Sequence, residues 1–181
     1  ILAPNPSPLT GAGTNTWLVG DRRLAVIDPG PDDARHLDAI LRAAGSGRIT
    51  AIVVTHAHAD HSALAVRLAD ATGAPVHAFG DARAGQDPAI AALGDLGGGE
   101  GVDAGFAPDV ILPDGGVLAD EGWRLTALHT PGHMGNHIAL AMGDLLFSGD
   151  HAMGWATSIV SPPDGDMGAY MASLDRLLAR G

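Results

Sequence analysis

The stretch that decides the fold is VVTHAHADHS, residues 53–62, in which four side chains able to bind metal ions occupy six positions. It continues the apolar run Ile49 to Val54. A run of this length without polar alternation predicts a strand covered on both faces, as in layered α/β architectures. Side chains alternate in an extended segment, so His56 and His58 should point to the same side and hold one metal ion between them.

Asp60 and His61 follow where the chain should turn into a helix, and they can serve a second ion or orient the first. The dipole at a helix N-terminus favours an ionised Asp60 carboxylate, the form that binds metal. Imidazole and carboxylate groups at the end of a buried strand are costly to desolvate unless a cation accepts their lone pairs. The sequence therefore predicts a metal centre at this point.

The composition favours a single globular domain over residues 1–181, with 46% hydrophobic and 17% charged residues and no apolar run long enough to cross a bilayer. A formal charge of −11 opposes sequence-independent binding to nucleic acid or to anionic membranes. The chain has no cysteine, so a metal site must use nitrogen and oxygen ligands. We expect a cytoplasmic protein whose N-terminus is incomplete, because the sequence starts without Met or a leader-like segment.

Periodicity and turn residues predict strands, then α/β units, then strands, then a helix. The expected strands are 16–19 and 24–27 (a hairpin), 49–54, 75–79, 109–112, 123–129, 136–142 and 145–148. The expected helices are 33–44, 62–72 and 167–178, the last with one buried apolar face. Residues 94–105 contain six glycines and should form a mobile surface loop.

Five motifs in chain order resemble those of the metallo-β-lactamase superfamily, whose fold is an αββα sandwich. They are Gly13-Thr14-Asn15-Thr16, Val26-Ile27-Asp28-Pro29-Gly30, His56-x-His58-x-Asp60-His61, His129-Thr130-Pro131-Gly132-His133 and Phe147-Ser148-Gly149-Asp150. Together they span nearly the whole chain, and the HxHxDH motif is highly specific.

The resemblance implies a site with two metal ions, two Zn²⁺ with iron or manganese as alternatives. In the family pattern one ion is bound by His56, His58 and His133, the second by Asp60 and His61, and both are bridged by Asp150. Two ions about 3.5–4 Å apart can share a hydroxide that acts as a nucleophile at neutral pH. Asp60 would also be catalytic, orienting the attacking water or accepting its proton.

The sequence departs from the family pattern in one respect. A last histidine ligand of the second metal is usual near the C-terminus of the domain, and no histidine follows His151 here. We therefore expect a domain truncated after Gly181, lacking its closing strands and one ligand of the second metal. A site short of one ligand should exchange its metal easily.

Further polar residues near the motifs have two possible roles each. Asp28 can support a metal ligand from behind or be a simple turn residue. His129 and His137 can donate hydrogen bonds into the site or serve a purely structural role. His151 can face substrate, and a loop position facing solvent is its alternative.

Asp150 points to the broad hydrolase branch of the superfamily, which includes glyoxalase-II-like thioesterases and the lactamase-beta-like-2 group. Residues 161–174 most resemble the latter group. We therefore expect a hydrolase that cleaves an ester, thioester or related bond in a small molecule. The alternatives are an endoribonuclease of the lactamase-beta-like-2 type, a mononuclear iron oxygenase and a non-catalytic metal-binding module; the oligomeric state stays open.

Overall fold

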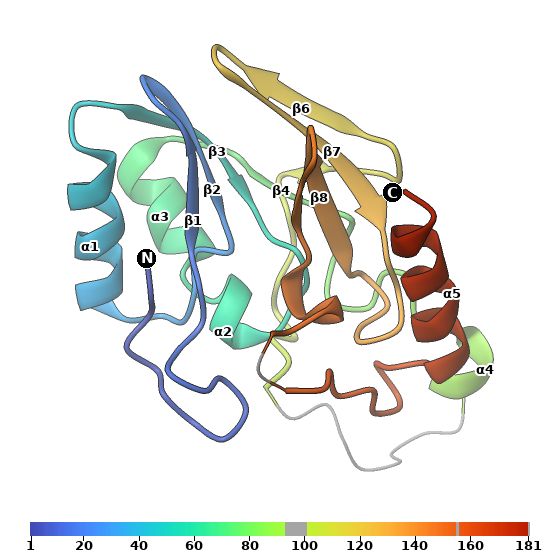
Figure 1. The fold of residues 1–181 in the computed structure, drawn as a ribbon. Helices are drawn as coiled ribbons and strands as arrows, with labels where there is room; N and C mark the ends of the chain where they lie inside the picture. Colours follow the sequence, from blue (N-terminus) through green and yellow to red (C-terminus); the bar gives the residue numbers. More distant parts are fainter. Residues whose placement is uncertain (93–100, 155, 181) are drawn as a thin grey trace.

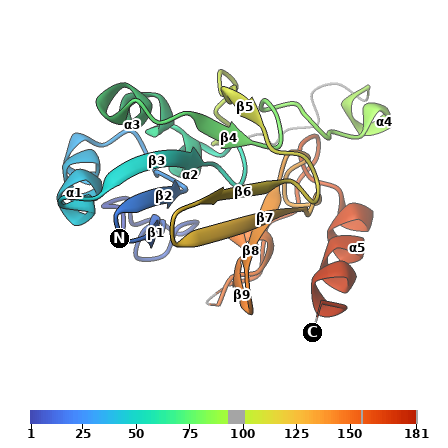
Figure 2. The same cartoon turned by 90° about the horizontal axis from the view of Figure 1, so that it is seen from above.

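The computed structural model describes residues 1–92, 101–154 and 156–180. Two β-sheets pack face to face, with helices on the outside (Figure 1). Helices α1 (Ala34–Ala44) and α3 (Ala65–Thr72) cover the outer side of the first sheet, and α5 (Met167–Leu178) lies beyond the second (Figures 1 and 2). This layering confirms the predicted αββα sandwich.

The first sheet has the strand order β1-β2-β3-β4-β5. Its strands are β1 (Trp17–Gly20), β2 (Arg23–Ile27), β3 (Arg48–Val53), β4 (Val76–Ala78) and β5 (Val110–Ile111). The first two form the predicted antiparallel hairpin, and β2 to β5 pair in parallel. Because parallel strands place their carboxyl ends at the same edge, the residues after β3 emerge at a natural site for ligands.

The second sheet is antiparallel, in the order β6-β7-β8-β9. Its strands are β6 (Val117–Asp120), β7 (Trp123–His129), β8 (Ile138–Met142) and β9 (Leu145–Phe147). The last three confirm predicted strands, although β8 begins two residues later than expected. Strand β6 was not predicted, because it is short and half exposed and so lacks a strong apolar signal.

The prediction of one continuous helix over 62–72 is wrong, because the helical segment begins earlier and is interrupted. Helix α2 (Ala59–Ser62) begins earlier, and α3 follows after a break at residues 63–64. At the break the amide of Leu64 donates a hydrogen bond to the carbonyl of Gly30, 3.0 Å away. Asp60 and His61 consequently lie within the first helical turn. A short helix α4 (Pro88–Ala91) and the 3-10 turn Gly149–His151 were not predicted.

Strand β3 has apolar contacts on both sides, as its continuous apolar run predicted. Ile52 belongs to the core beneath α1 and α3, whereas Ala51 and Val53 belong to the core between the two sheets. Strand β2 alternates in the same way, with Val26 facing the helices and Ile27 facing the other sheet. The strand before the histidine cluster is therefore fixed from both faces.

The prediction that the apolar stripe of α5 is buried is wrong in large part. Met167, Met171 and Leu178 are 58%, 52% and 78% exposed. The inner side of the helix is held by polar contacts to loops instead. Ser173 Oγ donates to the carbonyl of Pro131 at 2.7 Å, and the Tyr170 hydroxyl donates to the carbonyl of His151 at 2.9 Å.

Residues 93–100, the greater part of the predicted glycine loop, lie outside the described residues. The described end of the loop reaches the site, since Val102 forms a β-bridge with His58 and Gly101 accepts a hydrogen bond from Ala59. None of the helices in the described part of the chain has the length and hydropathy of a bilayer span.

Candidate metal centre

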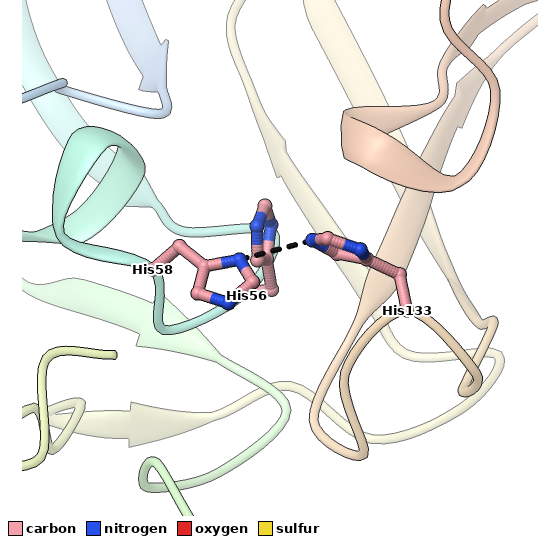
Figure 3. A group of neighbouring side chains, drawn as sticks. All are labelled: His56, His58 and His133. Atoms are coloured by element: carbon pink, nitrogen blue, oxygen red, sulfur yellow. Dashed lines mark hydrogen bonds between the residues drawn. The ribbon is translucent and has the colours of Figure 1, made fainter. Parts of the chain in front are cut away.

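His56 and His58 follow the carboxyl end of β3, and His133 comes from the loop between β7 and β8, so the two sheets meet at these rings (Figure 3). Ligand atoms of the three side chains lie within 4.8 Å of one another, close enough to hold one metal ion. His133 Nδ1 lies 2.6 Å from the carbonyl oxygen of Ile159 and must donate to it. Its Nε2 lone pair therefore faces His58 Nδ1 at 2.9 Å.

His56 lies at the centre of the cluster and is fully buried. Its Nδ1 contacts Thr55 Oγ1 at 3.0 Å, whereas its Nε2 has no hydrogen-bond partner in the described structure. An unpaired buried polar atom costs about 1–3 kcal/mol. Burial lowers the pKa of His56 well below its usual value, so the ring is neutral and offers a free lone pair. This donor fits a metal ion.

A second group of possible ligands consists of His56, His61 and Asp150, again within 4.8 Å. His61 Nε2 lies 3.3 Å from an Asp150 oxygen and 3.4 Å from an Asp60 oxygen. Burial opposes a charge on His61, but the carboxylates of Asp150 and Asp28 outweigh burial and raise its pKa well above the usual value. The surroundings of His61 Nε2 thus favour positive charge, which a metal ion supplies as well as a proton does.

Asp28 orients candidate ligands in both groups. It is buried at the end of β2 and accepts hydrogen bonds from the Thr55 amide at 2.7 Å, the Thr55 hydroxyl at 2.9 Å and His61 Nδ1 at 2.9 Å. Since the Thr55 hydroxyl donates to Asp28, it accepts from His56 Nδ1. Both His56 and His61 are thereby held with their protons on Nδ1 and their Nε2 atoms directed at the centre.

Asp60 is held from the N-terminal segment. Thr14 Oγ1 donates to Asp60 Oδ2 at 2.6 Å, and Asn5 Nδ2 donates to Thr14 Oγ1 at 3.1 Å. Burial opposes ionisation of Asp60, but His61 and the Thr14 hydroxyl outweigh it and lower the pKa of the carboxyl group. The roles of Thr14 and Thr55 were not predicted, although Thr14 lies in a quoted motif and Thr55 directly precedes His56.

His137 lies beneath the turn that bears Asp150. Its Nδ1 contacts Thr130 Oγ1 at 2.8 Å, and its ring centre is 5.1 Å from that of His56. A Cβ atom on Gly149 would come within 2.6 Å of His137 Nε2, so this glycine allows the turn to close over the ring. His137 therefore packs against the centre from behind.

The other two histidines near the motifs do not face the centre. His151 is fully buried, with its ring centre 4.4 Å from that of Tyr170, so it faces neither solvent nor a substrate cavity. His129 stacks on Phe79 at 3.8 Å and donates from Nε2 to the carbonyl of Gly135. His129 thus anchors the loop that carries His133 without entering the site.

Two neighbouring cavities adjoin the centre, with volumes of about 390 and about 630 Å³. Asp60 and Asp150 line both of them. The smaller cavity is bordered by Trp17 and Phe147, and the larger one by His58 and His133. A substrate can therefore extend in two directions from the carboxylates.

Fold and site together are those of one known class, and the chain belongs to the metallo-beta-lactamase superfamily, whose family model matches residues 9–181. Among curated proteins it is 33% identical over 195 residues to a beta-lactamase-like protein 2 homolog of Drosophila melanogaster, covering 98% of this chain and 59% of that protein. It is 32% identical over 191 residues to an atrochrysone carboxyl ACP thioesterase of Paecilomyces divaricatus, covering 99% of this chain and 51% of the relative.

A solved structure supports the same assignment. The protein TTHA1623, crystallised in a di-iron-bound form, superposes with a TM-score of 0.69 at 28% identity, covering 100% of this chain and 87% of that one. The chain spans 59% and 51% of the lengths of the two curated relatives. The predicted superfamily is confirmed, and its members are mostly hydrolases.

Proposed function

We propose that the chain is a hydrolase that holds two divalent cations, zinc by preference, and cleaves an ester, thioester or related bond in a small molecule. One observation carries the proposal. Asp150 places one carboxylate oxygen 3.3 Å from His61 Nε2 and the other 3.8 Å from His133 Nε2. The Asp150 carboxylate thus lies close to a histidine of each candidate ligand group, as a bridging ligand of a dinuclear centre would.

The remaining ligands divide around Asp150. One cation would be held by His56, His58 and His133, and the other by Asp60 and His61. When bound, two cations activate water at neutral pH and polarise the carbonyl group that is attacked. The lowered pKa of Asp60 keeps its carboxylate ionised at neutral pH, the form that binds a cation and accepts a hydrogen bond from the attacking water. Thr14 fixes Asp60 by donating to one of its oxygens.

One curated relative bears on the bond that is cleaved, and the di-iron structure bears on the metal. The 32% identical relative is named a thioesterase, which supports carbonyl chemistry on a thioester. The di-iron neighbour supports iron as a second candidate metal, since nitrogen and oxygen ligands suit both zinc and iron. Cleavage of RNA is disfavoured by the formal charge of −11, which repels a phosphate backbone.

The test is Asp150→Ala, with Asp144→Ala as its control. Asp144 is an exposed aspartate in the turn between β8 and β9, so its removal changes the charge equally without touching the centre. We expect Asp150→Ala to lower metal content by elemental analysis and to abolish thioester hydrolysis, with an unchanged circular dichroism spectrum. The proposal is wrong if Asp150→Ala keeps both its metal and its turnover.

A further inference from the structure

The two cavities beside the candidate centre differ in character: most of the surface of the larger one is apolar, whereas polar atoms form a greater share of the surface of the smaller one. Its apolar wall consists of Leu9, Pro31, Ala59, Ala63, Met153 and Ile159. It meets the smaller cavity at Asp60 and Asp150, where the proposed chemistry takes place. A substrate group bound in the larger cavity can therefore lie directly beside the bond that is cleaved.

The charged groups of the larger cavity outside the centre are acidic. Asp32 and Asp164 line it, and among the described residues no arginine lines either cavity. The sequence has no lysine, and its 10 basic residues are all arginines. Arg67 does not line the cavity, and its charge is paired with that of Asp32. An anionic group distant from the cleaved bond would thus meet the carboxylate of Asp164, and no described arginine lines the cavity to pair with that group.

We propose that the site selects substrates whose acyl group is neutral and apolar, seated in the larger cavity, and discriminates against acyl groups that end in a carboxylate or phosphate. This inference rests on the proposed hydrolase function. Hydrolysis of such a thioester forms a C–O bond between water and the carbonyl carbon and breaks the C–S bond. The thiolate leaves and takes up the proton that the water loses, so that a carboxylic acid and a thiol result.

The probes are N-acetylcysteamine thioesters that share one neutral leaving group and carry acetyl, hexanoyl or adipoyl chains. Adipoyl has the same number of carbons as hexanoyl and carries a carboxylate in place of the terminal methyl group. Burial of one methylene is worth about 0.8 kcal/mol, or about fourfold in kcat/KM. We therefore expect kcat/KM to rise at least about tenfold from acetyl to hexanoyl and to fall at least about tenfold from hexanoyl to adipoyl. Released thiol can be followed with a thiol reagent, because the protein has no cysteine.

The variant Leu9→Arg tests the origin of the selectivity. Leu9 lines both cavities and is 60% exposed, so arginine can be placed there without opening the core. The control is Val66→Arg, the same change of charge at a residue 66% exposed on α3. We expect Leu9→Arg to narrow the ratio of hexanoyl to adipoyl hydrolysis at least about threefold, and Val66→Arg to leave it unchanged.

Two results separate this inference from the function on which it rests. Adipoyl hydrolysis as fast as hexanoyl hydrolysis overturns the selectivity and leaves the hydrolase function intact. If none of the thioesters is cleaved, the thioesterase form of the proposed function is wrong, and selectivity is then measured by calorimetric binding of the matched hexanoyl and adipoyl amides. Equal binding of the two amides overturns the inference, and stronger binding of the hexanoyl amide supports it.

Discussion

The substitution Asp28→Asn tests whether one carboxylate behind the metal centre sets the metal affinity. Asp28 accepts three hydrogen bonds, from the Thr55 amide, the Thr55 hydroxyl and His61 Nδ1. Asparagine has nearly the same shape, but one of its two terminal atoms only donates. If the amide oxygen stays on the Thr55 amide, the NH₂ group faces His61 Nδ1 and forces the ring proton onto Nε2. The proton would then occupy the atom proposed to bind the metal ion.

The expected magnitude follows from these contacts. Loss of a partner behind a metal ligand lowers metal affinity about 10- to 100-fold, which corresponds to about 1.4–2.8 kcal/mol. Hydrogen bonds to a charged acceptor contribute about 1.5–3 kcal/mol, so the metal-free protein should also lose about that amount of unfolding free energy. Thr55→Val removes the hydroxyl contact to His56 but leaves the bond between Asp28 and His61. Its effect on metal affinity should therefore be smaller.

Metal affinity is measured by competition with a chromogenic chelator, and stability by urea unfolding in excess chelator. Asp21→Asn is the control, because Asp21 is an exposed aspartate in the turn between β1 and β2. It should match the wild type in both assays. If Asp28→Asn binds metal within about twofold of the wild type while folded, the proposed orientation of His61 by Asp28 is refuted.

Three further predictions concern the support of the site and its response to pH. Gly132 has φ 139°, and a Cβ there would lie 2.2 Å from Tyr170 Cα, so Gly132→Ala should cost more than about 2 kcal/mol in urea unfolding. Gly143→Ala, at φ 57° with no atom within 4 Å, should cost only about 1 kcal/mol. Tyr170→Phe removes the 2.9 Å bond to the carbonyl of His151 and should lower the unfolding free energy by about 1 kcal/mol, and an unchanged value would contradict that contact. Burial lowers the pKa of His77, so the unfolded chain takes up its proton first as pH falls. The unfolding free energy should therefore drop below about pH 6.5, by up to about 1.4 kcal/mol per pH unit from this group, and less steeply in His77→Gln; equal slopes in urea titrations would contradict this.

The layered fold could be predicted from the sequence because its signals are local. The continuous apolar run of β3, the turn between β1 and β2, and the Asp33 cap of α1 each lie within a few residues of the element they define. The break between α2 and α3 could not be predicted in this way. Ala63 and Leu64 are good helix formers, and the break coincides with a hydrogen bond from Leu64 to Gly30 on a distant loop.

The same distinction applies to the candidate site. The HxHxDH spacing predicts His56, His58 and His61 as neighbours because they share one short segment. The supports of these ligands come from far along the chain: Thr14 is 46 residues from Asp60, and the Ile159 carbonyl that orients His133 is 26 residues away. Periodicity contains no information about such pairs. The exposed stripe of α5 was mispredicted for a related reason, since amphipathic spacing cannot tell a core from a neighbouring loop.

Helix α5 touches two loops that each carry a ligand candidate. Ser173 and Tyr170 bind the carbonyls of Pro131 and His151, next to the loop of His133 and the turn of Asp150. The position of α5 therefore influences the distance between His133 and Asp150. Substitutions on the inner side of α5 would change the spacing of the candidate ligands without replacing any of them. Substitutions of its exposed methionines, Met167 and Met171, would not.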